Sequence, residues 1–205
     1  MLIQERAPMT ASLSTSTSSS TSPAFGASAG RDSAFRLEPR FDADSAAAGE
    51  PRIWVAVFDL PGEKVNKLSK RVMEEFETVV PRLERMHAAG EIDALMVVSG
   101  KPGNFIAGAD IALIQSARSA AEATQLSRSG QKLLDRWEDL PFPTVAAIHG
   151  AALGGGCELS LACSAIVMAD DPAARIGLPE VMLGFVPGMG GCVRLPRKIG
   201  LAGAL

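Results

Sequence analysis

The stretch AAIHGAALGGGCELSLAC occupies residues 146–163 and places three consecutive glycines between a predicted strand and a predicted helix. The glycines at 154–156 expose backbone N–H groups that no side chain shields. The loop is not a phosphate-binding P-loop, because no Lys and Ser or Thr follow the last glycine, and its spacing does not fit a dinucleotide-binding turn. Glu158 lies in the first turn of the helix, where an acid is favourable on electrostatic grounds alone.

Two further loops combine glycines with acidic residues. FIAGADI, at residues 105–111, follows a predicted strand and opens a short helix with small residues that let a ligand approach the main chain. In IGLPEVMLGFVPGMGGCVR, at residues 176–194, Glu180 has apolar neighbours and precedes a turn rich in Pro and Gly. Burial would raise the pKa of this carboxyl and make it a candidate proton donor. Taken singly, each carboxyl is also compatible with a purely structural role.

The apolar patterns around these loops alternate between strand and helix. Apolar residues recurring at steps of three and four predict a helix at 68–86, and further helical segments are expected at 109–116, 120–137 and 154–163. Strands separated by helices indicate an α/β fold with largely parallel pairing and right-handed crossovers. Short runs rich in β-forming residues predict the buried strands, at 53–58, 94–99, 144–149 and 165–169.

The composition is that of one globular domain with a tail. A chain of 205 residues and 21.4 kDa is too short for two full domains with separate cores. The net charge of −3 lacks the basic surplus of nucleic-acid binders. Three Cys and two His, with no pair at zinc-ligand spacing, predict neither a disulfide framework nor a metal site. No uncharged apolar run reaches the roughly 18–20 residues that span a bilayer.

Residues 1–50 are predicted to form a disordered tail, and residues 51–205 the folded domain. Residues 10–22 are almost all Ser or Thr, and such a segment buries too little apolar surface to offset the entropy of ordering. A mitochondrial transit peptide is disfavoured because residues 8–30 contain no Arg. Together with the free thiols, this predicts a cytoplasmic location.

In combination, the three loops indicate a particular chemistry. Two of them offer backbone N–H donors, and an oxyanion hole made of two such groups stabilises an enolate. Two carboxyls near glycine-rich turns supply an acid and a base. The set suits a reaction in which a thioester oxygen gains negative charge while a proton and a water molecule are moved.

These motifs resemble the enoyl-CoA hydratase/isomerase (crotonase) superfamily. The resemblance covers about residues 53–205 and is carried by FIAGADI, by AAIHGAALGGGCELSLAC and by residues 176–200. More narrowly, DDPAARIGLPE at 170–180 and RLPR at 194–197 resemble the hydratase portion of the multifunctional fatty-acid oxidation complex α-subunit. The resemblance implies a crotonase-like ββα spiral, and a trimer-based homo-oligomer or a partner in a fatty-acid oxidation complex.

The resemblance also implies roles for five residues. Ala109 and Gly155 match the positions whose backbone N–H groups form the oxyanion hole. Glu158 and Glu180 match the two catalytic glutamates, and Gly188 matches a backbone donor that helps to hold the reacting water. The presence of both acids favours a hydratase over superfamily members that lack one of them.

The implied reaction is the reversible syn addition of water to a trans-2-enoyl-CoA, a lyase reaction of fatty-acid β-oxidation that gives a 3-hydroxyacyl-CoA. Isomerisation of a Δ3- to a Δ2-enoyl-CoA in the same site is an alternative. A second alternative is a catalytically incompetent fragment that only binds or assembles, because complete family domains continue beyond the position of Leu205 and are closed by further helices. The substrate is a coenzyme A thioester. We expect no cofactor and no NAD site in this chain.

Overall fold

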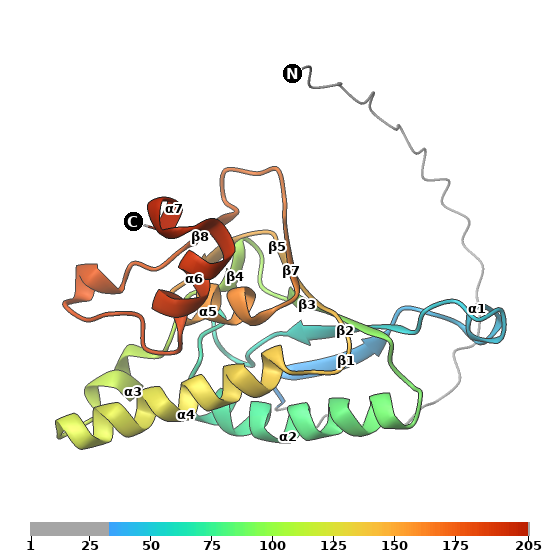
Figure 1. Ribbon diagram of the computed structural model, residues 1–205, viewed down its shortest axis with the longest axis horizontal. Coiled ribbons are helices and arrows are strands. Elements are labelled where there is room, and N and C mark those ends of the chain that lie inside the picture. Colours follow the sequence, from blue (N-terminus) through green and yellow to red (C-terminus); the bar gives the residue numbers. More distant parts are fainter. Residues whose placement is uncertain (1–32, 205) are drawn as a thin grey trace, which may run out of the picture.

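The computed structural model describes residues 33–204, which form two sheets and the helices that surround them (Figure 1). The larger sheet has the strand order β1-β2-β3-β5-β7, and the smaller sheet has the order β4-β6-β8. The strands are β1 (Phe35–Pro39), β2 (Ile53–Phe58), β3 (Ala94–Ser99), β4 (Asn104–Ile106), β5 (Thr144–Ile148), β6 (Ala151–Leu153), β7 (Ala165–Met168) and β8 (Arg175–Gly177). The helices are α1 (Ala43–Ala47), α2 (Lys70–Ala88), α3 (Ile111–Gln115), α4 (Ala120–Glu138), α5 (Gly155–Ala162), the 3₁₀ helix η1 (Glu180–Leu183), α6 (Gly191–Ile199) and α7 (Leu201–Ala204).

The predicted α/β architecture is confirmed for the larger sheet. Strands β2, β3, β5 and β7 all pair in parallel, as expected for strands joined through helices. The smaller sheet was not predicted from the sequence: residues 105–106 were expected to belong to a loop, and no strand was expected at 151–153 or 175–177. Its strands have only three residues each, too few to show a periodic pattern. Because β4 pairs with β6, this sheet brings the start of the loop after residue 106 close to the glycines at 154–156.

The predicted boundary of the disordered tail is wrong, because residues 33–50 are part of the fold. Strand β1 pairs antiparallel with β2, and Phe35 is only 4% exposed. The ring of Phe35 stacks on Phe58 and meets Phe76 edge-on, with centroid distances of 4.6 Å in both pairs. A short strand of mixed composition is stabilised here by a sheet edge that the sequence pattern does not reveal. Residues 1–32, also assigned to the tail, lie outside the described residues.

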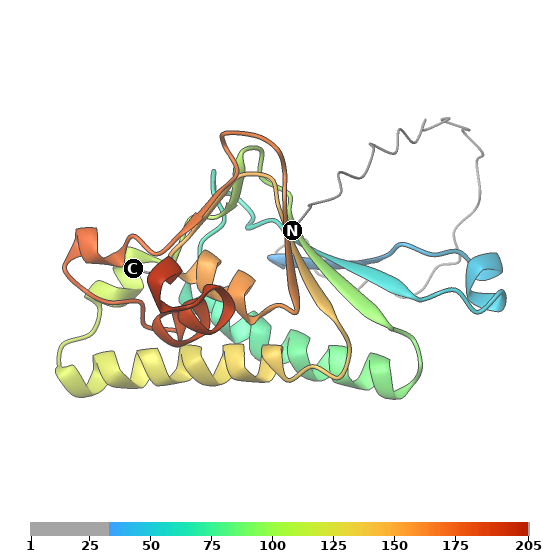
Figure 2. The same cartoon turned by 45° about the horizontal axis from the view of Figure 1, so that its top comes forward.

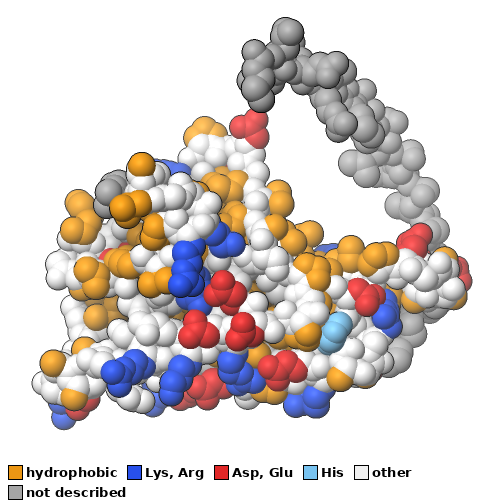
Figure 3. Space-filling model, viewed as in Figure 1, with side chains coloured by type: hydrophobic (Ala, Val, Ile, Leu, Met, Phe, Trp, Pro, Cys, Tyr) orange, Lys and Arg blue, Asp and Glu red, His pale blue; other side chains and the backbone are white. Residues whose placement is uncertain are grey.

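Helices α2 and α4 lie side by side on one face of the larger sheet (Figures 1 and 2). Phe76 of α2 and Trp137 of α4 meet edge-on at 5.5 Å and belong to the main hydrophobic core. The outer surface of these helices carries charged side chains of both signs (Figure 3). Among residues 33–204, no helix combines the length and the apolar character needed to cross a membrane.

Candidate active site

Helix α5 is preceded by a glycine that no other residue replaces without strain. Gly154 has φ of 52° and ψ of −122°, and a Cβ there would lie 3.0 Å from Oε1 of Glu180. Two residues on, a Cβ on Gly156 would overlap the carbonyl oxygen of Ile106. The glycines therefore let α5 lie directly against strand β4 and the segment that follows it.

The backbone N–H groups of Ala109 and Gly155 lie close together and are free. Residues 66–68 pair in parallel with residues 107–110: the N–H of Leu68 donates to Gly108, and the N–H of Asp110 donates to Leu68. Because alternate residues of such a ladder point to opposite sides, the N–H of Ala109 faces away from Leu68. A Cβ on Gly155 would lie 3.4 Å from that nitrogen. Among residues 33–204, neither N–H donates a hydrogen bond, so both are available to one oxygen atom of a ligand.

Glu158 is held in one orientation by the loop that precedes α6. Its side chain is 2% exposed, and Oε1 accepts hydrogen bonds from the N–H groups of Met189 at 2.7 Å and Gly191 at 2.8 Å. Burial raises the pKa of Glu158, and the two backbone N–H groups oppose this shift because they stabilise the ionised form. The carboxyl is therefore buried but provided with donors for its negative charge.

Glu180 is buried without such donors. It begins helix η1, it is 7% exposed, and its Oε2 has no hydrogen-bond partner within the described part of the chain. Burial raises the pKa of Glu180, opposed by the residue's own backbone N–H. The two carboxyls thus differ in their surroundings: Glu158 has two backbone donors for its negative charge, whereas Oε2 of Glu180 has no partner among residues 33–204.

Gly188 belongs to the same loop as the donors to Glu158. Its carbonyl oxygen accepts a hydrogen bond of 2.8 Å from Nε2 of Gln131 on α4, and its N–H donates none among residues 33–204. A Cβ on Gly188 would lie 3.1 Å from Oγ of Ser127. A larger residue at position 188 would therefore crowd Ser127 of α4, and glycine leaves this space open.

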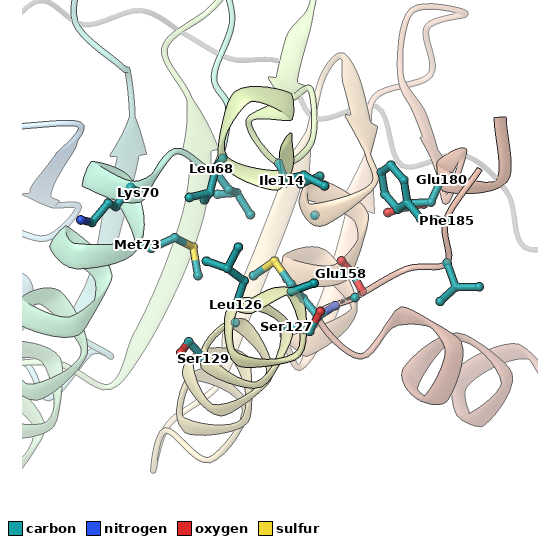
Figure 4. A pocket seen from close by; sticks show the side chains of 18 of the residues that line it. Leu68, Lys70, Met73, Ile114, Leu126, Ser127, Ser129, Glu158, Glu180 and Phe185 are labelled. Carbon is teal, nitrogen blue, oxygen red and sulfur yellow. Dashed lines mark hydrogen bonds between the residues drawn. The ribbon is translucent and has the colours of Figure 1, made fainter. Parts of the chain in front are cut away.

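A cavity of about 520 Å³ joins these groups (Figure 4). All five residues singled out in the sequence analysis line it: Ala109, Gly155, Glu158, Glu180 and Gly188. The rest of its wall is mostly apolar and comes from α2, α3, α4 and the segment after η1, with Leu68, Met73, Ile114, Leu126, Phe185 and Met189 among the contributors. Figure 4 shows Lys70 at the far side of the cavity from the two carboxyls.

Two side chains that were not predicted as site residues hold the loop before α6. Arg194 is 6% exposed and donates to the carbonyl oxygen of Met189 at 3.0 Å and to Asp135 and Glu138 of α4. Gln131 donates to Gly188 from the same helix. Gln131 does not stand out in the sequence, because a polar side chain within a helical pattern predicts only a solvent-facing position. Arg194 belongs to the RLPR stretch that carries the resemblance, but the sequence gives it no partner. Within residues 33–204, no cluster of His, Cys, Asp and Glu could hold a metal ion.

Comparison with known proteins gives a consistent result. The family model described as enoyl-CoA hydratase/isomerase matches residues 53–205. The fatty acid oxidation complex subunit alpha of Vibrio cholerae is 50% identical over 152 residues, which are 74% of this chain and 21% of that protein. The subunit of the same name from Aliivibrio fischeri is 51% identical over 74% of this chain and 22% of its own length. The chain thus spans about a fifth of the length of these curated relatives.

Solved structures agree with the sequence relatives. The enoyl-CoA hydratase of Bacillus anthracis matches with a TM-score of 0.71 and 27% identity, over 84% of this chain and 60% of that chain. Pseudomonas aeruginosa DspI matches with a TM-score of 0.71 and 26% identity, over 87% of this chain and 62% of that chain. The chain therefore belongs to the enoyl-CoA hydratase/isomerase family and shares the α/β fold of its solved members.

Proposed function

We propose that this member of the enoyl-CoA hydratase/isomerase family catalyses the reversible syn addition of water to a trans-2-enoyl-CoA, giving a 3-hydroxyacyl-CoA. One observation carries the proposal: two buried carboxyls and two free backbone N–H groups line a single, mostly apolar cavity. Such a cavity accepts an acyl chain, and its few polar groups converge where the thioester would react. The family and the names of the relatives support the same reaction.

The N–H groups of Ala109 and Gly155 bind the thioester oxygen in this mechanism. Attack of water at C3 moves negative charge onto that oxygen, and the two donors stabilise the enolate as it forms. Both N–H groups are fixed by the backbone, Ala109 by the ladder with residues 66–68 and Gly155 by the start of α5. Loss of one such donor raises the barrier by about 3–4 kcal/mol.

The two glutamates divide the proton transfers. Glu158, whose ionised form accepts two backbone hydrogen bonds, takes a proton from water as the water oxygen bonds to C3. Glu180, whose Oε2 has no partner among residues 33–204, is protonated and delivers its proton to C2. Overall, one water is added across the double bond: its hydroxyl bonds to C3, its proton passes to Glu158, and the proton of Glu180 passes to C2. Exchange with solvent after product release removes the proton from Glu158 and returns one to Glu180, which restores the starting enzyme. The free N–H of Gly188 orients the water beside Glu158.

The test is the loss of enoyl absorbance when the chain is mixed with crotonyl-CoA, with the product identified by mass spectrometry as 3-hydroxybutyryl-CoA. A 3-enoyl-CoA offered in parallel separates hydration from isomerisation, because the isomerase reaction yields a 2-enoyl-CoA of unchanged mass. The presence of two buried carboxyls favours hydration, since isomerisation needs one carboxyl to carry the proton. Absence of turnover with both thioesters, while a CoA thioester binds, would support a protein that only binds.

The proposal extends to assembly and location. Relatives named as subunits of a fatty acid oxidation complex support a role as a complex component or as a trimer-based homo-oligomer. Light scattering at several protein concentrations tests this. The free thiols of Cys157, Cys163 and Cys192 support a reducing compartment, and we propose the cytoplasm.

A further inference from the structure

We propose that Gln131 is a positioning residue for Glu158 and acts through the peptide unit that joins Gly188 to Met189. The inference rests on the proposed function for its catalytic readout. Nε2 of Gln131 donates to the carbonyl oxygen of this unit at 2.8 Å, and the N–H of the same unit donates to Oε1 of Glu158 at 2.7 Å. In a planar trans peptide these two groups point in opposite directions. Gln131 and Glu158 therefore hold one rigid plane from its two sides.

An external anchor matters for this peptide unit because a glycine lies at one of its two ends. The two torsions that turn this unit are ψ of Gly188 and φ of Met189, and Gly188 has no Cβ to restrict the first of them. Glycine permits backbone rotations that other residues resist, so this plane can turn at low cost. A rotation that moves the carbonyl away from Gln131 also moves the Met189 N–H away from Glu158. The hydrogen bond from α4 thus fixes the direction of a donor to the catalytic carboxyl.

The neighbouring peptide units are anchored in a different way. The Met189 carbonyl accepts from Arg194, and the Gly190 carbonyl accepts from the N–H groups of Val193 and Arg194 in the first turn of α6. These bonds form within the loop and the helix that continues it. Gln131 lies on α4, 57 residues away in sequence, so its bond ties the loop directly to the helix that forms a wall of the cavity. Arg194 reaches the same helix only through its ion pairs with Asp135 and Glu138.

The contact also affects the charge on Glu158. Hydrogen bonds in a chain polarise each other, so a donor on the Gly188 carbonyl strengthens the Met189 N–H as a donor to Glu158. That N–H lowers the pKa of Glu158 against the effect of burial. The other charged groups that act on this carboxyl are Glu180 on η1, which raises its pKa, and Arg194 on α6, which lowers it. The neighbouring Cys157 on α5 is a neutral thiol, because burial, followed by Glu158 and Glu180, raises its pKa to about 12. When the Met189 N–H turns away, the pKa of Glu158 rises, and a larger fraction of the base is protonated at a given pH.

The experiment compares the full chain with Gln131→Met, which keeps the length of the side chain and removes the donor. Gln125→Met is the matched control, because Gln125 is an exposed residue of the same helix. For Gln131→Met we expect kcat for crotonyl-CoA to fall on the order of tenfold, as for one lost hydrogen bond, with KM unchanged. The acidic limb of its kcat–pH profile moves to higher pH. The control keeps the kcat and the pH profile of the wild type.

A second variant guards against a failure to fold. Gln131→Glu keeps the shape of the side chain, and its ionised carboxylate repels the Gly188 carbonyl instead of donating to it. We expect the same loss of kcat at neutral pH. If Gln131 only ties α4 to the loop, both variants lower the thermal midpoint while kcat and the pH profile of the folded protein stay unchanged, and that result overturns the proposal.

A measurement without substrate separates this inference from the proposed function. The ¹³C signal of the Glu158 carboxyl, identified by its loss in Glu158→Gln, reports the titration of that group directly. A titration at higher pH in Gln131→Met than in the wild type supports the inference even if crotonyl-CoA is not hydrated, in which case only the proposed function fails. An unchanged titration overturns the inference, whatever the activity.

Discussion

Helix α5 and the segment from η1 to Val186 each supply one glutamate, and they are packed in opposite ways. Every residue of α5 is buried, and Glu158 is fixed there by two backbone hydrogen bonds. In the other segment Glu180 is buried, but Met182 is 83% exposed and Val181 and Val186 also lie on the surface. Figure 3 shows exposed apolar side chains gathered on the side where α6 and α7 lie. The position of Glu158 is thus set by core packing, whereas that of Glu180 depends on the course of a thinly packed backbone.

The largest expected effect is on turnover and falls on both glutamates. Glu158→Gln and Glu180→Gln keep the shape of the side chain and remove proton transfer, which contributes roughly 10²–10⁴-fold, or about 3–5 kcal/mol of barrier. We expect hydration of crotonyl-CoA to fall by that factor in each variant, while binding of a CoA thioester, measured by calorimetry, persists. Near-normal turnover of either variant would show that its carboxyl takes no part in the reaction. The difference in packing between the two segments would then have no consequence for catalysis.

The next effect separates the two segments by stability. Leu159, next to Glu158 on α5, is 1% exposed and belongs to the core. Leu159→Ala removes buried methyl groups and leaves a cavity, so we expect a loss of about 2–5 kcal/mol in the free energy of unfolding. Denaturant titration of the wild type and the variant measures it. A loss below about 1 kcal/mol would show that α5 is not more tightly packed than the segment from η1 to Val186.

These contrasts also explain how far the sequence could predict the molecule. Strands β2, β3, β5 and β7 follow from short apolar runs, and the five site residues follow from the resemblance of three glycine loops to a family. The predicted burial of β7 is wrong, because this strand lies at the edge of the larger sheet, where Val167 is 59% exposed and Met168 39% exposed. Strand β1 was missed because Arg36 and Glu38 interrupt its apolar residues, and only the contact of Phe35 with Phe58 and Phe76 makes it part of the core. The contacts of Gln131 and Arg194 were missed because they join α4 to a segment more than 50 residues away in sequence: Gln131 donates to the carbonyl of Gly188, and Arg194 pairs with Asp135 and Glu138.

A smaller effect is expected on the pH dependence of stability, and it distinguishes the two carboxyls. Burial raises the pKa of Glu180 above its value in the unfolded chain, so ionisation of this group weakens the fold as pH rises through the folded pKa. Glu180→Gln cannot ionise, and we therefore expect it to become more stable than the wild type as pH rises, by about 1.4 kcal/mol for each unit by which the pKa is raised.

Glu158→Gln provides the comparison for this pH effect. Burial also raises the pKa of Glu158, but the N–H groups of Met189 and Gly191 stabilise its ionised form and would face an amide in the variant. We expect its stability to gain less with pH. Thermal midpoints from pH 4 to pH 9 measure both variants. An equal gain in the two, or none in Glu180→Gln, would contradict the difference in surroundings on which the assignment of acid and base depends.

The smallest expected effect is at Met182, in the thinly packed segment. Its side chain is 83% exposed, so truncation to Ala removes few contacts, and exposed positions of this kind change stability by no more than about 0.5 kcal/mol. Met182→Ala should therefore match the wild type in denaturant titration, beside the large loss in Leu159→Ala, and it should keep the turnover because Glu180 and its backbone are unchanged. Repeating the titration over a tenfold range of protein concentration is the necessary control. A loss above about 1 kcal/mol that grows with protein concentration would mean that Met182 packs against another copy of the chain, and the position of Glu180 would then be fixed by assembly rather than by the course of its own backbone.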